Sequence, residues 1–541
     1  MKMINTHAIR NKTAAKKIIA ATAALLTAGT VFAQETASAA NAPDSEEGLD
    51  AFATDDAASA EPAIAFNGRA VLDTRAYVDE TDVDAFDDLA DFHTTSTPSF
   101  TLGTEYNGSV VSVDSKLKFS ESTIKSTPAD VIDELTVRAN MGNFLLEAGK
   151  MKIVWGKGDK LHVLDNFNAD DYTDFIIPDY IDRRISTPMI HAAYGFDKGN
   201  IRIEGVYAPI MATDRFAMSG EWTPASYTTL ASKVTGVEEA NLSSAFTAYN
   251  KALITASNMA ALYAADPATY AAQYAAAMQD LTAKATAYQT VLASVSSFSA
   301  DDLYPDTTSL RYGQAGTRIT GTLGSFDWGA SYYYGHYKQP SVDWSNYIAS
   351  AAANSGKSYA LPVLAYDQKQ VFGVEGATVL GPLNLRAEAA YTLTEDTDGT
   401  NPWIHNNSVA WLGGFDVDLP VHNMNVNIQE TGTYVLNNDA ISDGAYKVYD
   451  VDYNANDCYT NDKLVLALSD SFMHDKLKTE ATVMWGIENG DVLVMPKVTY
   501  TVNGTLGLSA SGLYIWCKDD NSEFSAWKDN SFVNLGVTCN F

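Results

Sequence analysis

The 541-residue sequence is poor in cysteine and in positive charge. Its three cysteines, Cys458, Cys517 and Cys539, can form at most one disulfide, so no disulfide framework supports the fold. Lys and Arg number 36 against 67 Asp and Glu, which gives a formal net charge of −31. Such an acidic chain offers no general surface for nucleic acid. The acidity suits the passage or binding of cations, or the solubility of long exposed loops.

Motifs for catalysis and cofactor binding are also missing. The eight histidines are scattered, and none lies in a nucleophile motif such as G-x-S-x-G. No phosphate-binding loop, Cys-x-x-Cys pair or zinc-ligand spacing occurs. His162 and His191 flank an acidic segment, but isolated histidines are usually structural or solvated. We therefore predict a protein that is not an enzyme, with no catalytic residues and no cofactor.

The one long apolar run covers residues 18–32. Basic residues precede it and Ala33 follows, which predicts a secretory signal peptide over 1–33; Ala37-Ser38-Ala39 offers a second cleavage position. The run is shorter than the ~20 residues that a membrane-spanning helix needs. Because no later charge-free run approaches that length, insertion into a membrane would require a closed β-barrel. Residues 34–62, rich in Ala, Asp, Glu and Ser, are predicted to be a flexible acidic leader.

From Ile64 almost to the end, apolar and polar residues alternate. Clear examples are the segments 135–141, 326–334 and 385–391, where apolar positions recur at every second residue. A period of two indicates β-strands with one apolar and one polar face. Several of these strands carry charged residues on the polar face. So many recurring strands favour closure into a barrel over residues 63–541, with a polar lumen.

The connections between the predicted strands alternate between short and long. Short turns are expected at 107–108, 142–143, 197–200, 324–325, 381–382, 419–422, 474–475 and 503–504. Longer connections are expected at 78–98, 120–130, 155–188, 211–310, 338–367, 395–406, 437–460, 488–491 and 518–528. This sorting is typical of an outer-membrane, antiparallel up-and-down barrel with periplasmic turns and external loops, and it predicts about 18 strands, with 16 the nearest alternative. A barrel of this size can hold an aqueous channel.

One external loop has a helical pattern. Residues 237–298 are rich in Ala, contain no Gly, and place Leu and Tyr residues at helical spacing on both sides of Asp266-Pro267. Asp followed by Pro is a helix stop and a new helix start. We predict an α-helical hairpin inserted in this loop, acting as a lid or spacer, or alternatively as a gate or partner-binding element.

The carboxy-terminal strand alternates through Val533, Leu535, Val537, Cys539 and Phe541. A terminal strand that ends on an aromatic residue resembles the signal read by the bacterial barrel-assembly machinery. We therefore predict that Val537, Cys539 and Phe541 form an assembly signal.

Residues 149–170 resemble a known family pattern. The run from Gly149 through Trp155 and Gly156 to Asp159, continuing with Asn168 and the nearby aspartates, is similar to the Gly-x5-Trp-Gly pattern of a bacterial outer-membrane barrel family of unassigned function. That family is akin to alginate-export and porin-type barrels. The segments 201–209 and 507–516 and the terminal Phe541 are similar to the same family. The resemblance implies a pore or exporter-like barrel and names no substrate.

The loop 155–188 is the predicted constriction, because a loop of this length can fold into the lumen and set ion selectivity by charge. Its candidate residues are Asp159, Lys160, Asp165, Asp170, Asp171, Arg183 and Arg184. Inward candidates on the strands are Arg69, Lys116, Arg138 and Arg386. Asp165, Asp170 and Asp174 are weak candidates for Ca²⁺, since their spacing does not match an EF-hand. A solvated charged loop is the plain alternative.

These patterns predict an outer-membrane porin or channel for small solutes, with a preference for cations. Its expected partners are outer-membrane lipid, the barrel-assembly machinery and the solutes themselves, with no nucleic acid. One alternative is a surface-exposed structural or adhesin-type barrel whose helical insert binds a partner. A second alternative is a transporter for hydrophobic compounds. The solute and the oligomeric state stay open.

Overall fold

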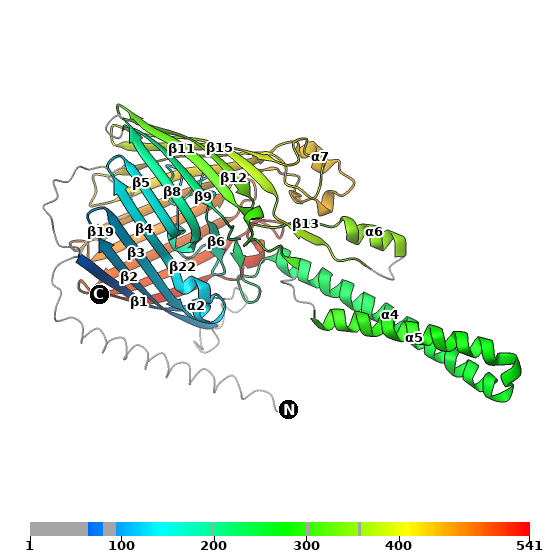
Figure 1. The fold of residues 1–541 in the computed structure, drawn as a ribbon. Helices are drawn as coiled ribbons and strands as arrows, with labels where there is room; N and C mark the ends of the chain where they lie inside the picture. Colours follow the sequence, from blue (N-terminus) through cyan, green and yellow to red (C-terminus); the bar gives the residue numbers. More distant parts are fainter. Residues whose placement is uncertain (1–62, 79–92, 197–199, 298–302, 355–358) are drawn as a thin grey trace.

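The computed structural model describes residues 63–78, 93–196, 200–297, 303–354 and 359–541. The predicted signal peptide and acidic leader lie outside the described residues, as do most of the connection 78–98 and of the turn 197–200. Within the described part, the chain forms a barrel from which a pair of long helices projects (Figure 1).

The barrel consists of eighteen strands among the described residues. Each strand pairs antiparallel with its neighbours along the chain, and β1 pairs with β23 to close the sheet. The strands are β1 (Ala63–Tyr77), β2 (Thr94–Asn107), β3 (Val111–Ser120), β4 (Ile132–Met141), β5 (Phe144–Met151), β8 (Thr187–Phe196), β9 (Ile201–Ala208), β11 (Gln314–Leu323), β12 (Phe326–His336), β15 (Gln368–Leu380), β16 (Leu383–Thr394), β17 (Ser408–Asp418), β18 (Asn425–Val435), β19 (Thr460–Phe472), β20 (Leu477–Gly486), β21 (Val492–Thr501), β22 (Leu506–Trp516) and β23 (Phe532–Asn540). The predicted all-β barrel of about 18 strands is confirmed.

The outer face of the barrel is apolar and exposed. On β8, Ile190 is 51% exposed and Tyr194 is 43% exposed, whereas His191 between them is buried. On β23, Leu535 is 62% exposed while Asn534 is buried. A continuous exposed apolar belt around a closed barrel is a lipid-facing surface, since every backbone group of the wall is paired within the sheet. The chain is therefore an outer-membrane β-barrel.

Short turns and long loops lie at opposite ends of the barrel, as predicted. Tight turns such as those at Gly142, Gly324 and Gly381 need positive φ, and these glycines have φ of 63°, 66° and 62°. β1 starts at the short-turn end, where Phe541 also pairs with Gly68 through two backbone hydrogen bonds of 2.7 and 2.9 Å. Both ends of the barrel sheet thus lie at the end expected to face the periplasm.

The long loops carry small elements of their own. These are α2 (Glu121–Lys125), η3 (Pro128–Val131), β6 (Ala169–Tyr172), α3 (Tyr180–Arg183), β7 (Arg184–Ile185), β10 (Arg215–Phe216), η6 (Leu310–Tyr312), β13 (Ser341–Asp343), α6 (Ser345–Asn354), β14 (Val363–Ala365), α7 (Asn438–Ser442), η7 (Lys447–Tyr449) and η8 (Ser525–Trp527). The three cysteines are free in the structure.

The predicted helical hairpin is present as α4 (Ala225–Ala265) and α5 (Pro267–Ser297). The break falls at Asp266-Pro267, where the Asp266 side chain accepts a hydrogen bond of 3.3 Å from the backbone of Thr269. The two helices pack through small and aromatic residues, with Tyr263 stacked on Tyr274. The pair points away from the barrel rather than across its mouth (Figure 1). Neither helix, nor any other among the described residues, has the length and apolar character needed to cross a membrane.

Candidate functional site

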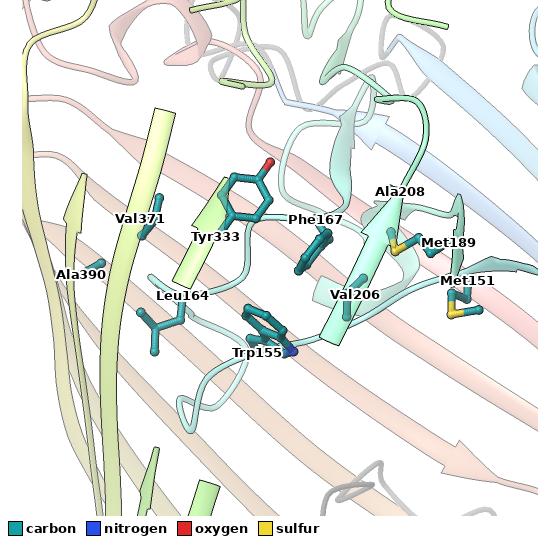
Figure 2. Packing of buried hydrophobic residues seen from close by; sticks show 10 residues of the cluster. All are labelled: Met151, Trp155, Leu164, Phe167, Met189, Val206, Ala208, Tyr333, Val371 and Ala390. Carbon is teal, nitrogen blue, oxygen red and sulfur yellow. The ribbon is translucent and has the colours of Figure 1, made fainter. Parts of the chain in front are cut away.

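The loop that follows β5, residues 152–186, folds into the barrel. Trp155, Leu164 and Phe167 of this loop are almost fully buried, and they pack against inward side chains of β9, β12 and β15. Figure 2 shows these three residues facing Val206 and Tyr333 inside the wall. Trp155 and Phe167 meet edge to face, with ring centroids 5.1 Å apart. An apolar core therefore lies within the lumen, built by one loop against one side of the barrel.

Two inward-facing glycines provide the space for this packing. A Cβ atom on Gly316 of β11 would lie 2.8 Å from the Phe167 ring and 2.9 Å from the Trp155 ring. A Cβ atom on Gly373 of β15 would lie 2.4 Å from the side chain of Leu164. All three distances are shorter than real Cβ contacts allow. The absence of side chains at these two wall positions thus lets the loop approach the strands.

A buried carboxylate holds the tip of the loop. Glu388 of β16 accepts backbone hydrogen bonds from Lys157 (2.7 Å), Gly158 (2.6 Å) and Val163 (2.9 Å). Its Oε1 also lies 3.2 Å from Nδ1 of His162. A carboxylate that accepts several backbone N–H groups is strongly stabilised in its charged form, and it fixes the donors in turn. Glu388 is therefore the main polar anchor of the loop tip.

The tip reaches strands on the far side of the barrel. Gln429 of β18 accepts from the backbone N–H of Asp159 at 3.0 Å and donates to its carbonyl at 2.7 Å. Asn427 of the same strand donates to the Asp159 carboxylate at 2.7 Å. Because β8, β9, β11, β12, β15, β16 and β17 separate β5 from β18, the loop crosses the lumen to make these contacts.

A second part of the loop packs toward β1 and the last strands. Arg75 of β1 forms a two-pronged ion pair with Asp174, with N–O distances of 2.6 and 3.0 Å. Beside it, Phe175 stacks on Trp222 with ring centroids 5.0 Å apart and also contacts Trp527. The loop is thus attached at several points around the barrel.

Several charges of the loop are used to hold the loop together. Arg184 pairs with Asp165 and, at 3.1 Å, with Asp170, while Tyr180 donates a hydrogen bond to Asp165. Burial opposes the charge of Arg184, but the attraction of Asp165 outweighs it and raises the Arg184 pKa. These groups are buried inside the loop and do not line its edge.

A row of alternating charges runs along the wall to which the loop is attached. Glu147 of β5 accepts from Arg138 at 2.6 Å and lies 2.6 Å from Nδ1 of His191. The other ring nitrogen of His191 lies 3.0 Å from Glu204, which also pairs with Arg318 at 3.2 Å. With a carboxylate at each ring nitrogen, His191 satisfies both only as an imidazolium that donates twice. The row is a fixed part of the wall.

The opposite wall is accessible to water. The inward side chains of Lys116 on β3, Lys478 on β20 and Glu480 on β20 are 33%, 48% and 29% exposed. On the loop-covered wall, by contrast, the side chains of Glu375 and Glu388 are 1% and 0% exposed. The loop therefore leaves polar side chains of β3 and β20 in contact with solvent.

The charged edge of the loop, called here the lip, consists of Asp159, Lys160, Asp179 and Asp182. Lys160 and Asp179 are exposed and form an ion pair of 3.4 Å. Burial lowers the pKa of Lys160, but Asp179, Asp159 and, across the lumen, Glu480 raise it overall. Asp182 lies 3.9 Å from Lys116 of β3. The lip thus carries charges of both signs and faces the water-accessible wall.

Comparisons with known proteins give only a distant likeness. No family model and no curated protein matches the sequence. The BenF-like porin from Pseudomonas fluorescens is 10% identical, with a TM-score of 0.41 over 89% of this chain and 98% of that one. OccAB4 from Acinetobacter baumannii is 9% identical, with a TM-score of 0.40 over 88% of this chain and 97% of that one. The outer-membrane channel DcaP from the same organism is 9% identical, with a TM-score of 0.37 over 89% of this chain and 97% of that one.

Likeness at this level carries no conclusion about function, which must rest on the geometry of this barrel.

The structure divides the predicted constriction residues into groups. Asp159 and Lys160 lie at the lip, and Lys116 lies on the water-accessible wall opposite. Asp165, Asp170, Arg183 and Arg184 are inside the loop, where Arg183 donates to the carbonyls of Ile176 and Pro178 at 3.3 Å. The others are apart from the lip: Asp171 pairs with Arg215, Arg138 with Glu147, Arg386 with Asp416, and Arg69 is exposed on β1.

The calcium candidates do not converge. Asp165 and Asp170 share Arg184, whereas Asp174 pairs with Arg75. The described residues contain no group of three or more side chains suited to hold a metal ion.

Sequence analysis missed the residues that position the loop. Glu388, Gly316 and Gly373 each occupy an inward register position of a strand, and only the alternation could have marked them. Inward glycines signal a close approach by another segment, but the sequence does not show which segment approaches.

Proposed function

We propose that this barrel is a constricted outer-membrane channel through which small hydrophilic solutes pass beside the lip. The observation that carries the proposal is the contrast between the two walls. The loop covers the β8–β16 side, while Lys116, Lys478 and Glu480 on the other side keep solvent contact. A loop that is attached around the barrel but leaves these side chains in contact with water narrows a lumen without filling it. Charges placed at such a narrowing set selectivity.

A cation preference is part of the proposal. The chain carries 67 acidic against 36 basic residues, and the arginines of the loop are committed to buried or backbone contacts. At the lip, Asp179 pairs with Lys160 and Asp182 with Lys116, while the Asp159 carboxylate accepts a hydrogen bond from the neutral Asn427. This local excess of carboxylates supports attraction of cations to the narrowing.

Thiol labelling of the channel tests the route. In a background with all three native cysteines changed to Ser, Glu480→Cys places a thiol on the water-accessible wall. Thr479→Cys is the matched control, because Thr479 is the adjacent residue on the same strand and its side chain points to the outer side of the wall. A charged methanethiosulfonate reagent should reduce the single-channel current of the first variant and leave that of the control unchanged. An equal change of the single-channel current in the two variants after labelling, or no change in either, would refute the proposed route.

One observation, the α4–α5 hairpin, supports the alternative of a surface-exposed barrel that binds a partner. The hairpin projects away from the barrel mouth (Figure 1), so it contributes nothing to the narrowing. A role outside the channel therefore fits it better than the predicted lid.

A further inference from the structure

Contacts with two external loops hold the base of the α4–α5 hairpin. Asn241 of α4 forms two hydrogen bonds with the backbone of Tyr359, at 2.9 and 3.0 Å. Lys233 of α4 lies over the rings of Trp344 and Tyr449, 4.8 and 5.3 Å from their centroids. The loops after β12 and β18 thus fix the base of the hairpin. Such contacts orient the hairpin relative to the barrel.

Beyond this base the hairpin has no other support from the barrel in Figure 1. The part of α4 from Asn241 to Ala265 would extend about 37 Å at the rise of an α-helix. This outer part, residues 242–297, is called the rod. The rod is therefore a long, oriented element whose sides are open to other molecules.

The rod differs in charge from the rest of the chain. Its charged residues are Lys251, Asp266, Asp280 and Lys284, which sum to zero, whereas the whole chain carries −31. Contacts between copies of this chain through other acidic surfaces would meet like-charge repulsion. The rod avoids this repulsion, so it is the external segment best suited to meet a second copy.

The rod also exposes apolar side chains. Phe246 is 46% exposed and Leu253 is 42% exposed, and their seven-residue spacing places them on the same side of α4. Ile254, Leu262 and Met278 are exposed as well. Two Ala-rich helices bury only one stripe of each helix against the other, so the remaining apolar side chains stay in contact with water. A further helical surface would cover Phe246 and Leu253.

We propose that the rod docks against the rod of a second copy of this chain in the same membrane. Two hairpins packed face to face form a four-helix arrangement. A rod face about 37 Å long and about 18 Å wide offers roughly 650 Å² per copy, which is about 1,300 Å² per pair. This lies within the ~1,200–2,000 Å² of stable interfaces. Because all copies are inserted with one orientation, their rods project on the same side of the membrane, which lowers the orientational cost of docking.

Cysteine cross-linking tests this arrangement in liposomes that contain the full-length barrel without native cysteines. In a parallel pair Leu253 faces its own counterpart, so Leu253→Cys should give disulfide-linked dimers on mild oxidation. Thr255→Cys is the control, since Thr255 is exposed and lies about 200° around α4 from Leu253. We expect at least tenfold more dimer from the Leu253 variant. Equal cross-linking of the two variants, or none, would overturn the proposal and leave the face to a different partner.

A charge pair gives a second test that does not depend on oxidation. Leu253→Lys and Leu253→Glu each place like charges at the proposed contact, and each should reduce self-association at least tenfold in a fluorescence energy-transfer assay. An equal mixture of the two variants should restore it. Both substitutions are at an exposed position, so the barrel should fold and conduct as before. Unchanged association in the single variants would also overturn the proposal.

Discussion

Replacing Glu388 with Ala should release the tip of the lumen loop without unfolding the barrel. The substitution removes the acceptor of three backbone N–H groups and of His162. The strand hydrogen bonds of β16 to β15 and β17 involve only backbone atoms and remain. The perturbation is therefore local to the contact between the loop and the wall.

The size of the effect follows from the buried network. Removing one partner of a buried, hydrogen-bonded charge costs about 3–5 kcal/mol. The ratio of docked to released loop should then fall by roughly 10²- to 4 × 10³-fold, since 1.4 kcal/mol is tenfold. The apolar packing of Trp155, Leu164 and Phe167 remains, so we expect exchange between docked and released states. Glu388→Gln keeps one acceptor oxygen and should show a smaller effect in the same direction.

Single-channel recording and limited proteolysis check this expectation. Glu388→Ala should add a larger, flickering conductance level and make the backbone near Lys157 and Lys160 cleavable by trypsin. Glu480→Gln is the control, because it changes a lumen charge without touching the loop anchor. Wild-type conductance and wild-type protease resistance in Glu388→Ala would refute the anchoring role.

Four further outcomes are expected. Gly316→Val should expel Trp155 and Phe167 at a cost of about 1–3 kcal/mol, detected as new protease sensitivity of the loop with unchanged heat-modifiable migration. Burial raises the pKa of Asp450 in the external loop from its ordinary 3.8 to about 6, so the protonated form is favoured in the folded loop. The stability of this loop should therefore fall as the pH rises from about 4 to 6. Hydrogen exchange measures this dependence, and Asp450→Asn should remove it. Deleting Phe541 should block insertion and leave protease-sensitive protein, whereas normal migration would contradict the predicted assembly signal. Replacing residues 242–297 by a Gly/Ser linker should leave conductance unchanged, because long loops cost little closure entropy; a barrel that fails to fold would contradict the external placement of the rod.

The barrel could be predicted from the sequence because its determinants are local. Alternation sets the two faces of each strand, and turn residues such as Gly142, Gly324 and Gly381 set the hairpins. The hairpin break was also readable, at Asp266-Pro267. The structure begins α4 at Ala225, twelve residues before the predicted start at 237, and Gly236 lies inside α4. Packing at the base of the hairpin overrides the weak helix propensity of glycine there.

The lumen loop could not be derived in the same way, because its position depends on contacts between distant residues. The sequence shows seven candidate charges in the loop, but it does not show that Arg184 forms buried ion pairs with Asp165 and Asp170. It shows Glu388 as one of several inward carboxylates but not that this one meets the loop tip. Which charges are buried and which form the lip is decided by the register of the loop against the wall, a tertiary property.

The conductance of the wild-type barrel in planar bilayers tests the central claim most directly. A lumen loop that leaves the inward side chains of β3 and β20 in contact with water predicts steady single-channel steps in salt solution, with reversal potentials in a salt gradient that favour cations. An insertion-competent, heat-modifiable barrel that gives no current would contradict the channel, and it would mean that the loop closes the lumen completely.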